Sequence, residues 1–296
     1  MANNLVVVVT GSNRGVGKGI VELLAKQKLE RPLTIYATSR SGENANIKAS
    51  SPNEIRYQKL DTKDSASIQS FFNIALKEQT ALDVLINNAA VSNDYRETPD
   101  YAAETVQTNY GGTRDMCKAF LAQPNLKPGS RIVNVTSGYN LLKTYGQDIQ
   151  NRFRAVTEIS DLDAMADDYL KVVKLGQEAQ QEAGWGSGAR SYKVSKALNN
   201  AVTILLAKQH PEVLINSCCP GWTDTAMGNQ AQGGTPPKTP QEGARVPVRL
   251  AIGDLGPKGD EDGALGHDTE KISGHFFENV NIMAPGWGKA KLWLDL

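Results

Sequence analysis

Two residues with proton-transfer chemistry, Tyr192 and Lys196, stand four positions apart in the stretch "RSYKVSKAL". A free tyrosine has a pKa of about 10, and a neighbouring ammonium lowers that value because it favours the phenolate. Residues four apart on a helix share one face, so the lysine can lie beside the tyrosine ring. The spacing therefore indicates either an acid with its electrostatic partner or only the start of a helix that carries a surface lysine.

A glycine-rich turn near the N-terminus, "TGSNRGVGKG", could bind a phosphate group. Gly11, Gly15 and Gly17 lie between an apolar segment, residues 5–10, and an amphipathic one, residues 15–28. Their spacing, G-x-x-x-G-x-G, differs from the G-x-G-x-x-G of the dehydrogenase fingerprint. The physics is related, because glycines let backbone N–H groups approach a pyrophosphate and the helix N-terminus adds positive potential. The turn predicts a dinucleotide site, which also includes Asn13, Arg14 and Val16.

The end of the second apolar segment bears on which dinucleotide is bound. A cofactor with a free ribose 2′-hydroxyl usually meets an Asp or Glu at this point. Here Ser39 ends the segment and Arg40 follows it, and Arg14 can reach the same side. A guanidinium binds a phosphate, whereas a carboxylate would repel it. These residues favour NADPH over NADH, unless Arg40 is merely a solvated residue after a strand.

The elements that must position these residues alternate along the chain. Two amphipathic stretches, residues 15–28 and 65–78, predict helices. Between and after them come short runs rich in Val, Ile and Leu, as expected of strands buried on both faces of a parallel sheet. These runs are residues 5–10, 33–39, 55–60, 82–89, 130–137 and 212–220. The alternation predicts one α/β domain, a Rossmann-like doubly wound parallel sheet with helices on both faces.

Two segments interrupt this alternation. Residues from about 139 to 186 are polar, have helical periodicity and carry no strand signal, so we expect a helical insertion. Residues from about 226 to 272 are rich in Gly and Pro. Their stretch "QGGTPPKTP" predicts a mobile loop beside a binding site, and "GDLGPKGDEDGALG" a surface hairpin or turn. Both stretches are equally consistent with ordinary surface loops.

Composition narrows the classes of function. The 296 residues contain 32 Lys plus Arg and 32 Asp plus Glu, so nothing in the charge balance suggests binding to nucleic acid or an anionic membrane. Three cysteines, two of them adjacent, make a disulfide framework improbable, and their spacing does not suggest zinc. The segment "NNLVVVVT" is too short for a signal core or a membrane span. We therefore expect a soluble cytoplasmic protein without a metal.

Seven motifs occur in one order along the chain: "TGSNRGVG", "LD", "NNAA", "QTNYGGT", "VNVTSG", "YKVSK" and "CCPGWTDT". With them the chain resembles the short-chain dehydrogenase/reductase family over almost its whole length. The stretches "TNYGGTRDMC", "CCPGW" and "SGHFFENVNIMAPGW" resemble the monomeric NADPH-dependent carbonyl reductase subgroup. The sequence departs from the family at Ala90, which stands where the family usually has glycine.

The resemblance implies a role for each member of a catalytic set. Tyr192 would donate the proton, and Lys196 would assist it and hydrogen-bond the nicotinamide ribose. Ser137 would hydrogen-bond the substrate oxygen, and Asn109 would hold a water that relays protons. The cofactor would also meet Asp61, Asn88, Ala89, Pro220, Gly221, Thr223 and Thr225. Tyr139, Trp222 and Met227 would line the substrate pocket.

The expected activity is NADPH-dependent reduction of a ketone or aldehyde to an alcohol. Two alternatives stay open: an NAD(P)-linked alcohol dehydrogenase working oxidatively, and a nonenzymatic NADPH-binding regulator. Ser137 and Tyr192 stand 55 positions apart, far more than in most members of the family. An insertion there can cover the helix face that other members use to form oligomers, so we expect a monomer that acts on a small carbonyl substrate.

Overall fold

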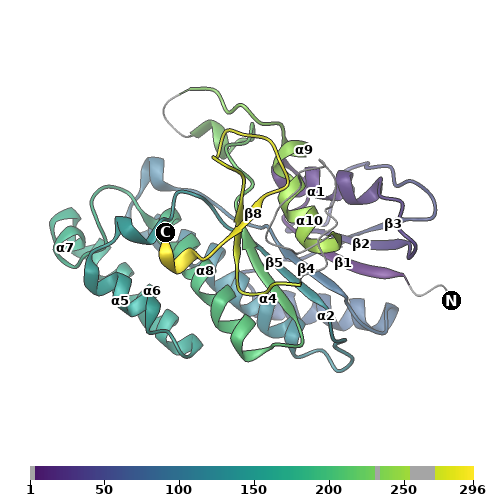
Figure 1. The fold of residues 1–296 in the computed structure, drawn as a ribbon, viewed down its shortest axis with the longest axis horizontal. Helices are drawn as coiled ribbons and strands as arrows, with labels where there is room; N and C mark the ends of the chain where they lie inside the picture. The colour runs from purple at the N-terminus through teal and green to yellow at the C-terminus, as the bar shows by residue number, and fades with distance from the viewer. Residues whose placement is uncertain (1–3, 231–233, 254–270) are drawn as a thin grey trace.

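A computed structural model of the chain describes residues 4–230, 234–253 and 271–296, and the strands found in these residues form one sheet (Figure 1). Their order across the sheet is β3-β2-β1-β4-β5-β6-β7-β8. All neighbours are parallel except β7 and β8, which are antiparallel. The strands are β1 (Leu5–Thr10), β2 (Leu33–Ser39), β3 (Glu54–Lys59), β4 (Val84–Asn87), β5 (Arg131–Val135), β6 (Leu214–Cys218), β7 (Phe276–Glu278) and β8 (Lys289–Lys291).

Helices cover both faces of this sheet and close a separate core on each. On one face, α1 (Gly15–Ala25) and α10 (Arg245–Ile252) pack on alternate residues of the central strands. The other face is covered by α2 (Ser65–Glu78), α4 (Gly112–Leu121) and α8 (Ser191–Gln209). The apolar run Val6–Val9 is buried throughout because it lies between the two layers. The predicted doubly wound α/β fold is confirmed.

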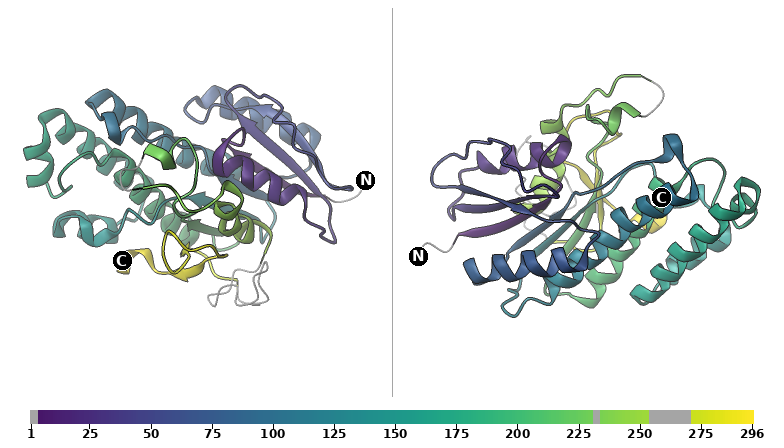
Figure 2. Two further views of the ribbon diagram at one scale, coloured as in Figure 1. Left: turned by 90° about the horizontal axis from the view of Figure 1, so that it is seen from above. Right: turned by 180° about the vertical axis from the view of Figure 1, so that it is seen from behind.

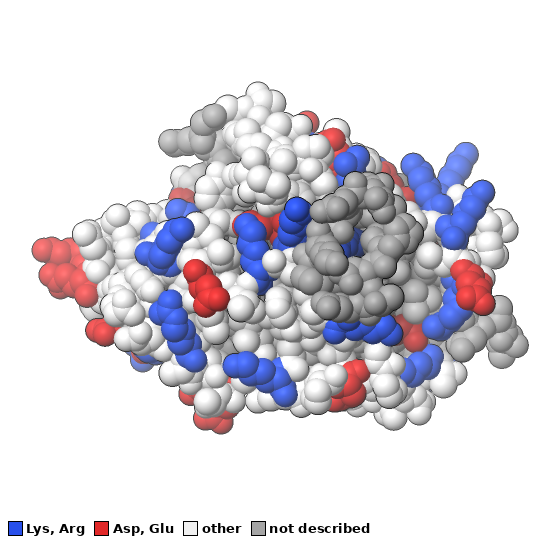
Figure 3. Space-filling view, in the orientation of Figure 1, with Lys and Arg blue, Asp and Glu red and all other residues white. Residues whose placement is uncertain are grey.

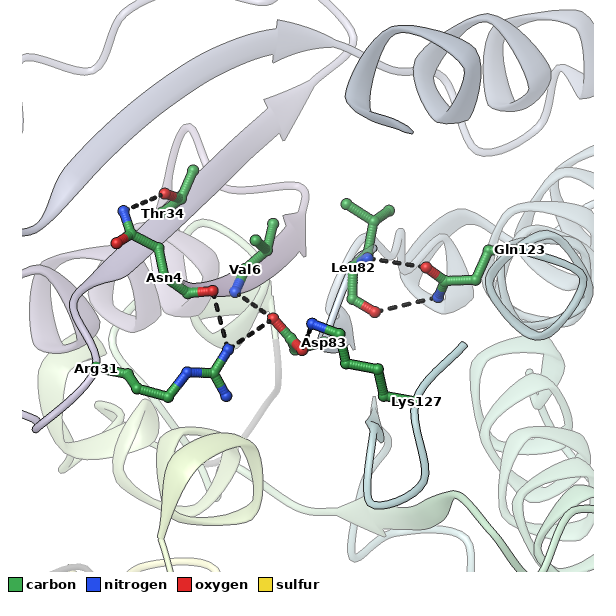
Figure 4. A network of polar contacts seen from close by, with 8 residues as sticks. All are labelled: Asn4, Val6, Arg31, Thr34, Leu82, Asp83, Gln123 and Lys127. Carbon is green, nitrogen blue, oxygen red and sulfur yellow. Dashed lines mark hydrogen bonds and ion pairs between the residues drawn. The ribbon is translucent and has the colours of Figure 1, made fainter. Parts of the chain in front are cut away.

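A polar network fixes the amino ends of the two central strands (Figure 4). Asp83, just before β4, accepts the Val6 N–H at 2.9 Å and forms ion pairs with Arg31 at 3.6 Å and Lys127 at 3.1 Å. Beside it, the Gln123 amide bonds both the N–H and the carbonyl of Leu82. These contacts set the relative position of β1 and β4, and therefore of the loops that leave their carboxyl ends.

The predicted insertion consists of helices. It contains α5 (Gln147–Arg154), α6 (Ile159–Leu175) and α7 (Gln177–Glu182). These helices lie at one end of the molecule and β1–β3 at the other (Figure 2). Helix α6 packs on α8 and on α3 (Pro99–Val106). The space beneath the insertion is filled by aromatic rings that meet edge to face or tilted: Tyr145, Phe153, Tyr169, Trp185 and Trp293.

The Gly/Pro-rich range 226–272 is not a loop throughout. It contains α9 (Pro240–Gly243) and α10, two helices that the sequence did not predict. Thr239 and Glu242 form a capping box that starts α9. Helix α10 buries its apolar side chains against the sheet. The stretch "GDLGPKGDEDGALG" after its first residue, and part of "QGGTPPKTP", lie outside the described residues.

Three further features of the described residues concern membrane spans, cysteines and surface charge. None of the described helices has the length and apolar character needed to cross a membrane. All three cysteines are buried and free of disulfide bonds. Basic and acidic side chains are interspersed over the face drawn in Figure 3, in line with the zero net charge.

Candidate active site

A cavity of about 700 Å³ lies at the carboxyl ends of the central parallel strands. Parallel α/β sheets bind their ligands at this edge. Most of the residues singled out from the sequence line it: Gly11, Asn13, Arg14, Gly15, Val16, Gly17, Ser39, Arg40, Asp61, Asn88, Ala89, Tyr192, Lys196, Pro220, Thr225 and Met227. Segments that lie far apart in the sequence therefore share one cavity wall.

The glycine turn leaves backbone, not side chains, at the cavity wall. Gly11 has a φ of +64°, and a Cβ there would lie 2.8 Å from the Ala89 Cα. A Cβ at Gly17 would lie 2.2 Å from the Gly11 carbonyl oxygen and 2.4 Å from the Asn88 Nδ2. The Asn88 amide donates to the carbonyls of Thr10 at 3.0 Å and Gly11 at 3.1 Å. Asn88 thus braces the turn, and only glycine fits at its two closest approaches.

Cationic side chains line the cavity. Of these, Arg14 and Arg40 are exposed, and within the described residues neither guanidinium has a hydrogen bond or ion pair. Lys63 also lines it and lies 4.0 Å from Glu104. Lys63 was not singled out from the sequence, although its position two residues after Asp61 could have indicated it. In the structure, the Asp61 carboxylate accepts the backbone N–H of Lys63. These cations can bind a phosphate in a cavity that the carboxylates of Asp61 and Glu104 also line.

Tyr192 and Lys196 lie together on the first turns of α8, as their spacing predicts. The Lys196 ammonium lies 5.7 Å from the centroid of the Tyr192 ring and donates to the Val135 carbonyl at 2.8 Å. Only 3% of the lysine is exposed. Ser137 lies just beyond β5, and its side chain is close enough to Tyr192 to lower the pKa of the phenol. The three residues therefore meet where β5 and α8 face each other.

Burial dominates the acidity of both titrating groups. It raises the pKa of Tyr192 above its usual value, an effect to which Cys219 and Asp94 add and which the Ser137 side chain opposes. Burial likewise lowers the pKa of Lys196 to about 8. The pair alone predicts a lowered tyrosine pKa, whereas the pKa of Tyr192 is raised, because loss of hydration is the largest influence on it. The lysine, in contrast, titrates near neutral pH.

Asn109 lies behind the cavity wall and not on it. It is fully buried in a π-helical segment, Gln107–Gly111, between α3 and α4. Its amide bonds both backbone groups of Val91 at 2.9 Å and donates to the Ser195 hydroxyl at 3.0 Å. Ser195 in turn donates to the Tyr192 carbonyl at 2.7 Å. Asn109 thus ties the loop after β4 to α8, and the water relay predicted for it stays a prediction.

Several predicted residues, Ser137 among them, lie outside the cavity lining. Gly221 and Thr223 support the loop after β6 from behind, where the Thr223 hydroxyl donates to the Gly221 carbonyl. Trp222 is anchored by its indole N–H on the Gly228 carbonyl at 2.9 Å. Tyr139 is 54% exposed. The substrate-pocket roles of Tyr139 and Trp222 stay predictions.

A buried lysine that the sequence did not single out holds the same loop. Lys238 is 2% exposed, and its ammonium donates to the Pro220 carbonyl at 2.7 Å. Burial lowers its pKa. No short motif marks this lysine, because its partner is 18 residues away and the contact depends on how the 221–238 segment folds back.

Two further points concern the chemistry that the cavity allows. Ala90 lines the cavity without strain: in the described part of the chain, Asn46 is the non-glycine residue with a left-handed φ. Among the described residues, no group of three His, Cys, Asp or Glu side chains is placed to hold a metal ion. The cavity offers instead a backbone cradle, cationic side chains and a half-buried tyrosine beside a buried lysine.

Known proteins show the same arrangement of sequence and fold. Residues 5–148 match the sequence model of a family described as short chain dehydrogenase. The chain is similar to carbonyl reductase (NADPH) 1 of Mus musculus, 34% identical over 263 residues that cover 83% of this chain and 90% of the relative. It also resembles the structure of menthone neomenthol reductase from Mentha piperita, with 25% identity, a TM-score of 0.71, and coverage of 93% and 98% of the two chains. It is likewise similar to the structure of salutaridine reductase from Papaver somniferum, with 27% identity, a TM-score of 0.67, and coverage of 83% and 95% of the two chains.

Proposed function

The chain belongs to the short-chain dehydrogenase/reductase family, and from that premise we propose that it reduces a ketone or aldehyde to an alcohol with NADPH. The mouse relative is named as an NADPH-dependent carbonyl reductase. The observation that carries the proposal is that Tyr192 and Lys196 line the same cavity as the glycine turn, with Ser137 beside Tyr192. This arrangement supports a proton donor that shares one cavity with a dinucleotide.

The cavity fits NADPH. The glycine turn accepts a pyrophosphate because its backbone is exposed where a Cβ would collide. Arg14, Arg40 and Lys63 would surround the phosphate that distinguishes NADPH from NADH, and the Ser39 hydroxyl lies beside them. Asp61 and Asn88 would lie along the adenosine, with Pro220 and Thr225 beside the nicotinamide. When bound, NADPH supplies the hydride.

The residues around Tyr192 would handle the carbonyl oxygen. Ser137 would donate a hydrogen bond to that oxygen and hold it near the phenol. Tyr192 would give its proton to the oxygen as negative charge develops there. The Lys196 ammonium, fixed by the Val135 carbonyl, would stabilise the phenolate that remains. Asn109 would act by keeping α8 and the loop after β4 in register.

The substrate would be apolar, hydrophobic or aromatic. Met227 and Val135 line the cavity together with Tyr192. Apolar side chains of this kind line most pockets for small molecules. Tyr139 and Trp222 stay predicted members of the substrate pocket.

We also propose that the protein is a single domain that works as a monomer. The insertion of about 139–186 supports this, because its helix α6 packs on the face of α8. In the described part of the 226–272 range, α9 and α10 pack on α1, the helix that follows the glycine turn. Met227 belongs to this range and lines the cavity, which supports the predicted contribution of the range to the substrate site.

Cofactor oxidation in the presence of carbonyl compounds tests this function. Purified protein is mixed with NADPH or NADH and a panel of quinones, isatin-like diketones and aldehydes, and the alcohol is identified by mass spectrometry. We expect NADPH oxidation matched by formation of alcohol, with NADH much less effective. Tight binding of NADPH without alcohol from any member of the panel would support the nonenzymatic alternative. A preference for oxidising alcohols with NAD would support the dehydrogenase alternative.

A further inference from the structure

Helix α8, which carries Tyr192 and Lys196, does not cap its own first turn. Its N-cap residue is Arg190, whose side chain forms no capping hydrogen bond, and no acidic residue lies in the first turn. The first N–H groups of a helix lack partners within the helix and need an acceptor from elsewhere. At this helix, a distant segment of the chain supplies the acceptors.

Two carboxylates of the loop after β4 accept these N–H groups. Asp94 accepts the Tyr192 N–H at 2.9 Å and, with the same oxygen, the Ser191 hydroxyl at 2.8 Å. Glu97 accepts the Ser191 N–H at 2.8 Å and the Arg190 N–H at 3.2 Å. Both carboxylates are half-buried. Negative charge at a helix N-terminus is also favourable because it faces the positive end of the helix dipole.

The segment that carries these carboxylates is itself held in place and forms part of the cavity wall. Asn93 and Arg96 line the cavity, and the Arg96 guanidinium donates to the Asn93 side chain. The Asn93 amide donates to the Glu104 carboxylate and to the Thr105 hydroxyl, both in α3, at 3.3 Å each. Thr98 then caps α3 through the Tyr101 N–H. Asp94 therefore stands on a short turn whose ends are both fixed.

We propose that Asp94 is a positioning residue for catalysis: it fixes the place of the Tyr192 phenol in the cavity through the first turn of α8. This inference rests on the proposed function, in which Tyr192 is the acid. Its hydrogen bonds end on Tyr192 itself and on the preceding residue, so nothing intervenes that could absorb a displacement. Glu97 holds the turn one residue earlier and would contribute less to the placement of the phenol.

A cap can also act only by stabilising the fold, so the test must separate the two roles. Asp94→Ala removes the acceptor, whereas Asp94→Asn keeps an oxygen acceptor, and Asn caps helices as well as Asp does. Asp100→Ala is the matched control, because Asp100 is an exposed carboxylate in the first turn of α3. NADPH fluorescence titration gives the Kd and the number of intact sites, and kcat with an isatin-like diketone is expressed per intact site.

The expected result for Asp94→Ala is a kcat per site lower by about ten- to a hundredfold, because a displacement of the acid by an ångström costs that much. Its Kd for NADPH should stay within about twofold, since the glycine turn is untouched. Asp94→Asn should return to within about threefold of the wild-type kcat. Asp100→Ala should behave as wild type in both measurements.

Two results would overturn the inference alone. One is a wild-type kcat per site in Asp94→Ala while Tyr192→Phe is inactive. The other is an Asp94→Asn variant as impaired as Asp94→Ala. Full activity of Tyr192→Phe in the same assay would instead overturn the proposed role of the phenol, and this inference with it.

Discussion

At the scale of single residues, the site depends on what surrounds two buried groups. Tyr192 and Lys196 share a helix face, as the sequence indicates, but burial sets their proton affinities and burial cannot be read from spacing. Ser137 reaches Tyr192, whereas Asn109 is committed to Val91 and Ser195. The residues proposed for catalysis can thus be picked out in the sequence, and their hydrogen-bond partners cannot.

The Lys196 pKa leads to a prediction about pH. Its value of about 8, lowered by burial, means that the side chain is charged below that pH and neutral above it. A neutral lysine no longer stabilises the Tyr192 phenolate, so kcat for carbonyl reduction should fall as the pH rises through about 8. The measurement is kcat at saturating NADPH and substrate across the neutral and alkaline range. The titrating groups that face Lys196 are Tyr192, Cys218 and Cys219, and a kcat that stays level well above this pH would contradict the prediction.

Arg40 leads to a prediction about cofactor choice. Removing its guanidinium in Arg40→Ala should raise the KM for NADPH by about tenfold, because a charge-assisted contact to phosphate is lost. The KM for NADH should hardly change. Lys48→Ala is the matched control, since Lys48 is an exposed cation that does not line the cavity. Equal changes in the KM for NADPH and in the KM for NADH would show that Arg40 does not contact the phosphate that distinguishes the two cofactors.

At the scale of elements, the sequence predicts what is local. Strands β1–β6 and helices α1 and α2 were expected within a few residues of their bounds, because each has an apolar pattern of its own. Helix α10 was missed because Gly and Pro surround it, although its apolar side chains face the sheet. The carboxylates that cap α8 were also missed, since Asp94 and Tyr192 lie 98 positions apart. Contacts of that range depend on topology and carry no local signal.

The loop after β6 gives a prediction at this scale. Gly221 has a φ of +81°, and a Cβ there would lie 2.6 Å from both the Ile282 carbonyl oxygen and the Lys238 Nζ. Gly129 has nearly the same φ, +82°, with nothing within 4 Å of its Cβ position. Gly129→Ala should therefore cost only the left-handed backbone, about 1–2 kcal/mol. Gly221→Ala should cost about 1–3 kcal/mol more, because it adds a collision in a packed region.

Urea unfolding of the two variants measures these costs, and titration with NADPH measures the second effect. Gly221→Ala should weaken NADPH binding because Pro220, which lines the cavity, moves with its neighbour. Gly129→Ala should bind NADPH as the wild type does. Equal losses of stability in the two variants would show that Lys238 and Ile282 do not confine Gly221.

At the scale of the whole molecule, the insertion changes which surfaces are available. The sequence showed its length and its helical character but not where it lies. In the structure, α6 packs on α8 and α3, and the aromatic rings beneath it join it to the C-terminal turn at Trp293. The face of α8 is therefore covered within one chain, which leaves less of it for a second copy.

The oligomeric state tests this arrangement. Size-exclusion chromatography with light scattering, at micromolar protein, should give the mass of one chain, 32.0 kDa. Addition of NADPH should leave that mass unchanged, since the cavity lies at the strand ends and not on α6. A stable dimer or tetramer would contradict the proposal that the insertion keeps the protein monomeric.

The central claim is that Tyr192 gives the proton when a carbonyl is reduced with NADPH. Its most direct test is a single-turnover measurement of NADPH oxidation in wild type and Tyr192→Phe, with the same carbonyl substrate and with Kd for NADPH determined for both. We predict a rate lower by about a hundred- to ten-thousandfold in Tyr192→Phe, the usual loss when a general acid is removed, and an unchanged Kd. Equal single-turnover rates in the two proteins would contradict the account.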